Sequence, residues 1–290
     1  MKFEGSIVAL ITPMNDQGDV DYQALTRLVE FHVENGSHGI VSVGTTGESA
    51  TLNVDEHLAV IKHTIKAANG RLPIIAGTGA NSTQEAISLT SEAAKLGADG
   101  ALLVVPYYNK PTQEGLYQHF RAIANAVDIP QVLYNVPGRT VADMSNDTIV
   151  RLADIDNIVA CKDATGDVAR GKELIDACGD KINILSGDDP TALELMKVGA
   201  KGDISVTANV APSLMSQMCR AALKGEFSKA EQLDEKLQLL HRDLFLESNP
   251  IPVKYAVSKL GFTANTLRLP LTPLSNNLES TVDSAIAAAV

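Results

Sequence analysis

The sequence predicts a TIM (β/α)8 barrel, a closed ring of eight parallel strands, followed by a C-terminal appendage of three helices. Two observations support this α/β fold class: short apolar runs alternate with longer amphipathic segments, and each of the eight runs is apolar through its length. A doubly wound open sheet is disfavoured, because its first strand normally leads into a Gly-rich turn and here it continues into Thr12-Pro13-Met14.

Each expected strand occupies an apolar run, and each expected helix fills the interval that follows it. The strands are expected at 6–12, 39–43, 73–77, 101–105, 131–135, 158–162, 182–186 and 203–207. The helices are expected at 21–35, 55–68, 82–96, 113–127, 145–153, 169–178, 190–198 and 212–223. Gly36 and Gly97 close the first and third helices, as glycine commonly does.

The alternating pattern stops after about Gly225. The remaining chain predicts helices at 226–246, 252–260 and 278–289, with Pro270 and Pro273 in the link between the last two. We therefore expect a barrel catalytic domain at 1–224 and a C-terminal helical domain at 225–290.

Composition excludes several classes of function. The net charge of -11 argues against nucleic acid or an anionic membrane as a partner, although a local basic pocket can still bind an anionic substrate. The three cysteines lie far apart without C-x-x-C spacing, and the six histidines show no paired spacing, so neither a disulfide framework nor a metal site is expected. No apolar stretch approaches the roughly 18 residues that a membrane span needs. We expect a cytoplasmic protein.

Lys162 ends the sixth expected strand. Burial at a strand end disfavours the charged ammonium, and a neutral lysine is a nucleophile that forms Schiff bases with carbonyl compounds. The alternative is that Lys162 only reaches out to solvent or pairs with neighbouring Asp163.

Unusual polar residues follow most of the other strands. Barrel enzymes carry their active sites at the C-terminal ends of the strands, so these residues should gather in one mouth. The groups are Gly44–Ser49, Gly77–Asn81, Pro106–Asn109, Tyr134–Arg139, Ser186–Asp189 and Ser205–Asn209. Hydroxyls and backbone amides would bind a carboxylate, a phenol would transfer protons, and a guanidinium would bind a second acid. Singly, each has a plain structural alternative: a common turn, a buried core ring, or a solvated surface arginine.

Three motifs resemble those of the dihydrodipicolinate synthases, or 4-hydroxy-tetrahydrodipicolinate synthases, of the lysine-Schiff-base pyruvate aldolase superfamily. They are G-T-T-G-E-S at 44–49, Y-N-V-P-G-R-T at 134–140 and K-D-A-T-G at 162–166. The resemblance covers essentially the whole chain, including S-V-T-A-N-V at 205–210 and N-P-I-P-V-K at 249–254. It implies condensation of pyruvate with L-aspartate 4-semialdehyde in lysine and diaminopimelate biosynthesis, with no cofactor beyond the covalent pyruvate.

The resemblance also implies roles for single residues. Lys162 would form the Schiff base and Tyr134 would transfer protons, while Thr45 and Tyr108 would complete a proton relay. Tyr108 would act in a neighbouring subunit's site, in a homotetramer built as a dimer of dimers.

The same resemblance assigns the substrate contacts. Thr46 would bind the pyruvate carboxylate, Arg139 would hold the carboxylate of the aldehyde, and the backbone near Gly187 and Ile204 would line the pyruvate pocket.

Some members of the family are inhibited by L-lysine. The residues that match this regulatory site are Ser49, Ala50, His57, Asn81, Glu85 and Tyr107. The alternative is that Asn81 caps the third helix and Glu85 is a solvated acid in its first turn. Two positions depart from the family pattern. Val54 stands where sensitive members often have a second histidine, and Asp203 replaces a usual apolar residue, for which an outward-facing strand start is the simplest account.

Other functions compete with this interpretation. An N-acetylneuraminate lyase or a keto-deoxy-sugar-acid aldolase would use the same lysine and tyrosine, but these relatives usually have Ser-Thr or Gly-Thr in place of Thr45-Thr46 and lack an arginine at position 139. A silent keto-acid sensor would typically lose the lysine or the phenol, and a phosphate-binding sugar aldolase would need a Gly-rich loop after strands seven and eight.

Overall fold

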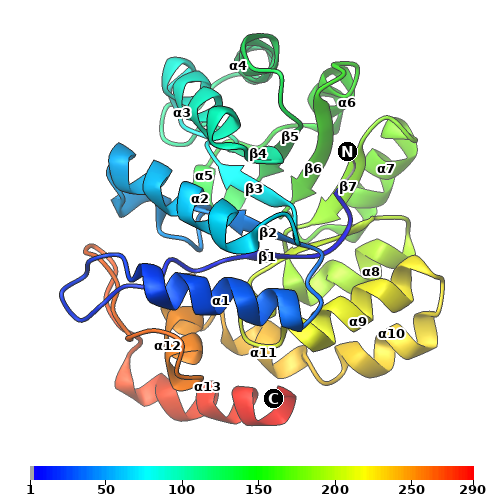
Figure 1. Ribbon diagram of the computed structural model, residues 1–290. Helices are drawn as coiled ribbons and strands as arrows, with labels where there is room; N and C mark the ends of the chain where they lie inside the picture. The colour runs from blue at the N-terminus through cyan, green and yellow to red at the C-terminus, as the bar shows by residue number, and fades with distance from the viewer. Residues whose placement is uncertain (1–2) are drawn as a thin grey trace.

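The computed structural model, which describes residues 3–290, is a closed barrel of eight parallel strands (Figure 1). The strands pair in chain order, and the last one pairs back with the first. They are β1 (Gly5–Ala9), β2 (Gly39–Ser42), β3 (Ile74–Gly77), β4 (Gly100–Val104), β5 (Gln131–Asn135), β6 (Ile158–Asp163), β7 (Asn183–Ser186) and β8 (Gly202–Ser205). The predicted fold class is confirmed.

Helices surround this barrel, and four more follow it near the C-terminus (Figure 1). The outer ring consists of α1 (Tyr22–Glu34), α2 (Val54–Ala68), α3 (Thr83–Leu96), α4 (Gln113–Ala126), α6 (Asn146–Leu152), α7 (Val168–Cys178), α8 (Ala192–Lys197) and α9 (Pro212–Leu223). The four-residue α5 (Pro137–Thr140) follows β5 directly. The C-terminal helices are α10 (Phe227–Asp234), α11 (Gln238–Asp243), α12 (Ile251–Lys259) and α13 (Asn276–Ala289). Among residues 3–290, no helix is long and apolar enough to span a membrane.

The two-residue period of the strands decides which side chains enter the barrel. The inner cluster contains Ile7, Ala9, Val41, Ile75, Leu102, Val132, Tyr134, Ala160, Leu185 and Ile204. Residues that alternate with these face outward and pack under the helices in two larger apolar clusters. Lys162 follows Ala160 by two positions and therefore faces the interior.

The C-terminal part differs from the prediction in one element. The expected helix over 226–246 is divided into α10 and α11. At the division the backbone tightens, so that the Leu237 amide donates to the Asp234 carbonyl at 2.8 Å. Leu237 in the link and Leu240 in α11 are both fully buried, so the apolar spacing continues through the division and gives no sign of it.

Asp203 lies on β8 beside the inward-facing Ile204 and therefore points out of the barrel, as a strand start facing outward would. The residue is nevertheless completely buried under the helical layer, and neither carboxylate oxygen has a hydrogen-bond partner among the described residues. Burial, together with the nearby Asp189 carboxylate, raises the pKa of Asp203 well above its ordinary value.

Candidate active site

Lys162 and Tyr134 face each other across adjacent strands. The two residues are paired in the register of β5 and β6, and both side chains are buried. The Lys162 Nζ lies 4.4 Å from the centroid of the Tyr134 ring. Gly187 leaves the room that this lysine needs, because a Cβ at position 187 would lie 2.5 Å from Lys162 Cε. An amine and a phenol therefore occupy one side of the barrel mouth.

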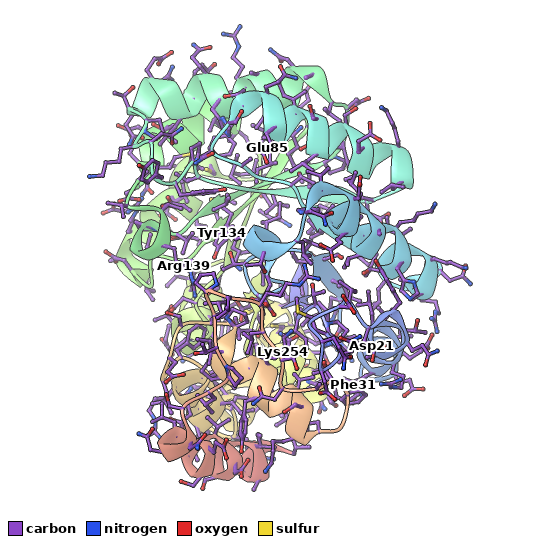
Figure 2. The ribbon with its side chains drawn as sticks, turned by 90° about the vertical axis from the view of Figure 1, so that its left-hand side faces the viewer. Asp21, Phe31, Glu85, Tyr134, Arg139 and Lys254 are labelled. Carbon is purple, nitrogen blue, oxygen red and sulfur yellow. The ribbon has the colours of Figure 1, made fainter. Side chains whose placement is uncertain are left out.

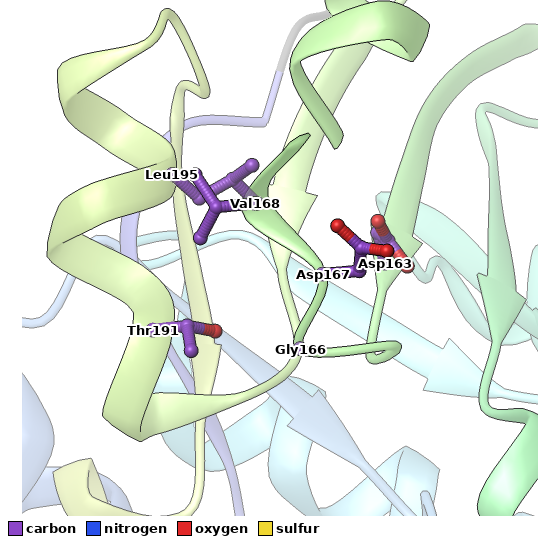
Figure 3. Close-up of a pocket in the computed structure, with 6 residues that line it drawn as sticks. All are labelled: Asp163, Gly166, Asp167, Val168, Thr191 and Leu195. Carbon is purple, nitrogen blue, oxygen red and sulfur yellow. The ribbon is translucent and has the colours of Figure 1, made fainter. Parts of the chain in front are cut away.

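Lys162 has no ion-pair partner among residues 3–290, which excludes the alternative of a pair with Asp163. The adjacent Asp163 alternates to the outer face of β6, where its carboxylate accepts the Thr165 amide at 3.1 Å. Figure 3 shows Asp163 at a crevice beside Gly166 and Asp167. This crevice is too narrow to hold a water molecule. Burial raises the pKa of Asp163.

Thr45 and Thr46 lie in a tight loop after β2. Val43 before them and Glu48 after them both have positive φ angles, +58° and +56°, which a β-branched valine rarely adopts. Thr46 is buried, and the Asn249 Nδ2 donates to its hydroxyl at 3.0 Å. The Thr46 proton is therefore free to be donated to a substrate oxygen.

Arg139 belongs to α5, a short helix after β5 that the sequence did not predict. Pro137 starts this helix, and Val141 ends it with a φ of +59°. The guanidinium is exposed at the mouth, where Nη2 donates to the Asn249 carbonyl at 3.1 Å. Figure 2 shows Arg139 and Tyr134 close together at this end of the barrel.

These groups line one cavity of about 160 Å³, large enough for a small keto acid. Among its lining residues are Thr45, Thr46, Tyr134, Arg139, Lys162, Gly187 and Asn249. The buried Ile204 follows Asp203 on β8 and belongs to the inner cluster next to this space. Six of the eight residues for which the sequence predicted catalytic or substrate-binding roles therefore line one cavity, and Ile204 belongs to the inner cluster that also contains Tyr134.

Tyr108 is the exception. Its side chain is 89% exposed, it lines neither of the cavities described here, and its φ is +73°. Tyr108 lies in the loop between β4 and α4 and is absent from the lining of the cavity around Lys162. Within a single chain, Tyr108 cannot take part in a relay with Tyr134.

A second, larger cavity of about 550 Å³ adjoins the mouth and shares Thr45, Val136, Arg139 and Asn249 with it. Five of the six predicted regulatory residues line this cavity: Ser49, Ala50, His57, Glu85 and Tyr107. The sixth, Asn81, is adjacent, since its Nδ2 donates to the Tyr107 carbonyl at 3.2 Å. Ser82 caps α3, so the capping alternative for Asn81 is wrong.

Burial changes the protonation of two side chains on the wall of the larger cavity. Burial lowers the pKa of His57, so its neutral ring donates Nε2–H to the Gly77 carbonyl at 2.7 Å. Burial and the Glu85 carboxylate raise the pKa of the Tyr107 phenol. Glu85 itself is exposed in the first turn of α3, as the alternative of a solvated acid expected. Among residues 3–290, no group of three or more His, Cys, Asp or Glu side chains could hold a metal ion.

Two residues close to the site were missed by the sequence analysis as functional residues. Asn249 contacts both Thr46 and Arg139, and Lys254 forms a buried ion pair with Glu48, with 2.7 Å between Nζ and Oε1. Both lie in the N-P-I-P-V-K segment, which drew attention only through the resemblance. A lysine at an otherwise apolar position of a short helix was the one signal available.

Known proteins match the chain over its whole length. The model of the dihydrodipicolinate synthetase family matches residues 2–289. A relative from Marinobacter nauticus, named 4-hydroxy-tetrahydrodipicolinate synthase, is 60% identical over 285 residues, which is 98% of each chain. A chloride-inhibited dihydrodipicolinate synthase from Acinetobacter baumannii, solved in complex with pyruvate, is 58% identical with a TM-score of 0.98 and 99% of each chain covered.

A third protein, the Cyanidioschyzon merolae enzyme solved with lysine bound, is 40% identical with a TM-score of 0.96, covering 99% of this chain and 98% of that one. The identity in all three cases extends over both the barrel and the C-terminal helices. On this evidence, the chain belongs to the dihydrodipicolinate synthetase family.

Proposed function

We propose that this chain condenses pyruvate with L-aspartate 4-semialdehyde through a Schiff base on Lys162, giving 4-hydroxy-tetrahydrodipicolinate for lysine and diaminopimelate biosynthesis. The observation that carries the proposal is the position of Lys162: buried, without an ion-pair partner among the described residues, and with its amine 4.4 Å from the Tyr134 ring. The 160 Å³ cavity around it holds hydroxyl and guanidinium groups suited to two carboxylates.

The first half of the reaction activates pyruvate. The Lys162 amine adds to the keto carbon, and loss of one water gives the imine. Thr46 binds the pyruvate carboxylate through its hydroxyl and backbone amide, and the backbone at Gly187 and Ile204 closes the other side. Tyr134 accepts and returns protons at the imine, and removal of a methyl proton produces the enamine.

The second half forms the carbon–carbon bond. The enamine carbon attacks the aldehyde, whose carboxylate is held by Arg139. Tyr134 protonates the new alkoxide. The amine of the former aldehyde substrate then attacks the imine carbon, which closes the ring and releases Lys162. The balance is pyruvate plus L-aspartate 4-semialdehyde giving the cyclic product and one water, and this chemistry needs no cofactor.

Borohydride trapping tests the proposal directly. Reduction in the presence of pyruvate should add one pyruvyl unit, and peptide mapping should locate it on Lys162. The purified protein should also consume both substrates in steady state. An unmodified chain would favour the sensor alternative, and cleavage of N-acetylneuraminate or a keto-deoxy-sugar acid without use of the semialdehyde would favour the rival aldolases.

We infer that the active form is a homotetramer built as a dimer of dimers. Tyr108 supports this inference, because a phenol that is 89% exposed at a left-handed φ is suited to enter a partner's mouth and to join its Thr45 and Tyr134 in a proton relay. Analytical ultracentrifugation should give the mass of four chains. A second test mixes a Tyr108→Phe chain with a Tyr134→Phe chain, which should restore activity above that of either variant alone.

We also infer that L-lysine binds in the 550 Å³ cavity as a feedback inhibitor. The Glu85 carboxylate and the Tyr107 phenol lie on its wall, with His57 and Ser49 nearby, and they could hold the two ends of a free amino acid. Calorimetry with L-lysine should show binding that Glu85→Gln weakens. D-lysine serves as the control ligand. Val54, which stands where sensitive family members often have a second histidine, is 53% exposed on the wall of the same cavity. Its side chain has no ring nitrogen to offer to a ligand.

A further inference from the structure

The threonine loop at the mouth, residues 44–49, adopts a conformation that it would not hold alone. Val43 and Glu48 flank the threonines with φ angles of +58° and +56°. Left-handed backbone at two residues other than glycine, one of them β-branched, is unfavourable and persists only where the surrounding structure enforces it. Contacts from outside the loop must therefore supply the restraint.

Residues 249–268, called here the C-terminal segment, supply several of these contacts. Lys254, on α12, has a fully buried side chain, and Figure 2 shows its place on that helix. Its Nζ lies 2.7 Å from Glu48 Oε1 and donates to the Thr12 carbonyl at 2.6 Å. The ammonium therefore joins the loop after β1, which contains Thr12, to the loop after β2, which contains Glu48. Lys254 itself is 242 residues away from Thr12 in the sequence.

Other bonds hold the same loop from both sides. The Arg268 backbone amide donates to Glu48 Oε2 at 3.2 Å, and the Thr12 hydroxyl donates to the Gly47 carbonyl at 2.7 Å. The Arg268 guanidinium donates to the Thr51 carbonyl at 2.9 Å. Glu48 thus lies between two parts of the C-terminal segment, and the loop that carries Thr45 and Thr46 cannot shift unless these bonds break.

The energetics of the ion pair argue for a positioning role. Taking both charges out of water is costly, so a buried ion pair is weak evidence of stabilisation, and an apolar pair of the same size is often as stable. Burial lowers the pKa of Lys254, while the Glu48 carboxylate opposes this by favouring the charged form. What an ion pair adds over an apolar contact is a fixed partner and geometry.

We propose that Glu48 and Lys254 are positioning residues that hold the Thr45–Thr46 loop in the geometry that binds the pyruvate carboxylate, so that pyruvate affinity depends on the C-terminal segment. This inference rests on the proposed function and deepens it. Neither residue lines the 160 Å³ cavity, although Glu48 lines the adjoining 550 Å³ cavity. The ion pair acts through Thr46, which precedes Glu48 by two residues in the same loop. The Thr46 hydroxyl also accepts a hydrogen bond from Asn249 of the C-terminal segment.

Three variants test the proposal. The double variant Glu48→Gln with Lys254→Met removes both charges and conserves volume, which avoids leaving one buried charge without a partner. Glu48→Asp keeps the charge and shortens its reach by one methylene. Lys259→Met is the matched control: it makes the same substitution on α12, at an exposed pair with Asp283 that does not touch the loop.

The main readout is the pyruvate concentration that half-saturates borohydride trapping, measured by intact mass. We expect this concentration to rise roughly tenfold in the double variant and about threefold in Glu48→Asp, the scale of one hydrogen bond lost or weakened. It should stay within twofold of wild type in Lys259→Met. The KM for the semialdehyde should change less than twofold in every variant, because the Arg139 guanidinium is bonded to the Asn249 carbonyl and not to Glu48 or Lys254. A merely structural pair would lower Tm without this selective effect.

Hydrogen exchange provides a readout that does not depend on pyruvate. Amides of residues 44–49 should exchange faster in the double variant, while those of β5 and β6 should be unchanged. If the wild-type protein traps no pyruvate, the proposed function is wrong. The hydrogen-exchange rates of residues 44–49 then decide whether Glu48 and Lys254 position the loop. Unchanged exchange in the loop, or unchanged half-saturation in a folded double variant, would overturn the inference.

Discussion

The two halves of the barrel mouth are built in different ways. Lys162 and Tyr134 lie on neighbouring strands, and strand register places them side by side. Thr45, Thr46 and Arg139 lie on a strained loop and a four-residue helix, and contacts from Asn249, more than a hundred residues away in sequence, hold two of them. The comparison teaches that the proposed covalent chemistry rests on the sheet, whereas recognition of the carboxylates rests on long-range contacts.

The largest effect should come from the strand half. Lys162→Ala removes the amine that forms the imine, and no other described lysine lines the cavity, so activity should fall by at least about a thousandfold. Circular dichroism and Tm should stay close to wild type. Lys172→Ala, which removes an exposed lysine of α7, is the control and should be fully active. Near wild-type turnover in Lys162→Ala would refute the assignment of the nucleophile.

Tyr134→Phe tests the second member of the strand half. The ring and its packing remain, but the proton donor is lost, so kcat should fall by about a hundredfold or more. The alternative that Tyr134 is only a core ring predicts unchanged kinetics. Comparison of kcat with Tm separates the two, and Tyr117→Phe on α4 provides a control in which a phenol is lost far from the mouth.

Sequence patterns predicted the strand half well because its determinants are local. Eight apolar runs predicted the barrel, and Lys162, which ends one of those runs, was singled out by its position. The role of Tyr134 came from the family resemblance, because a single buried tyrosine in a strand is more often a core ring. The loop half was harder to predict. The helix α5 is too short for any periodicity, and Ser82 rather than Asn81 caps α3.

The contacts that hold the loop half were the least accessible to sequence reasoning. The bond from Asn249 to Thr46 spans 203 residues, and nothing in the local pattern around Lys254 reveals that Glu48 is its partner. The positive φ of Val43 is likewise imposed from outside, since valine disfavours it. The expected domain boundary at 224/225 marks the point where the sequence pattern changes. Because residues beyond it contact the threonine loop, we propose that the functional unit includes both sides of this boundary.

Arg139→Ala tests the loop half directly. Loss of a charged hydrogen-bonding group should raise the KM for L-aspartate 4-semialdehyde roughly ten- to a hundredfold, with the KM for pyruvate nearly unchanged. Arg151→Ala, at an exposed pair with Glu114, is the control. Equal effects on both substrates would count against separate carboxylate sites and would weaken the comparison between the two halves.

The smallest effect should come from the outer face of a strand. Asp203 shares β8 with Ile204 but points away from the mouth, so a change there should affect stability and leave both KM values unaltered. Its folded-state pKa is raised, so the native state binds a proton that the unfolded chain releases above about pH 4. Stability contributed by this protonated form is complete at low pH and declines as pH rises toward the folded pKa.

Asp203→Asn mimics the neutral acid at every pH and should therefore remove this decline. We expect its Tm at pH 8 to exceed that of wild type by about 2–4 °C, the shift that about 1 kcal/mol produces in a chain of this size, and the difference to shrink toward pH 4. Thermal melts across this pH range provide the measurement. A variant equally stabilised at both ends of the range would show that Asp203 does not bind a proton in the folded state, and altered kinetics would show that the outer face of β8 is coupled to the mouth after all.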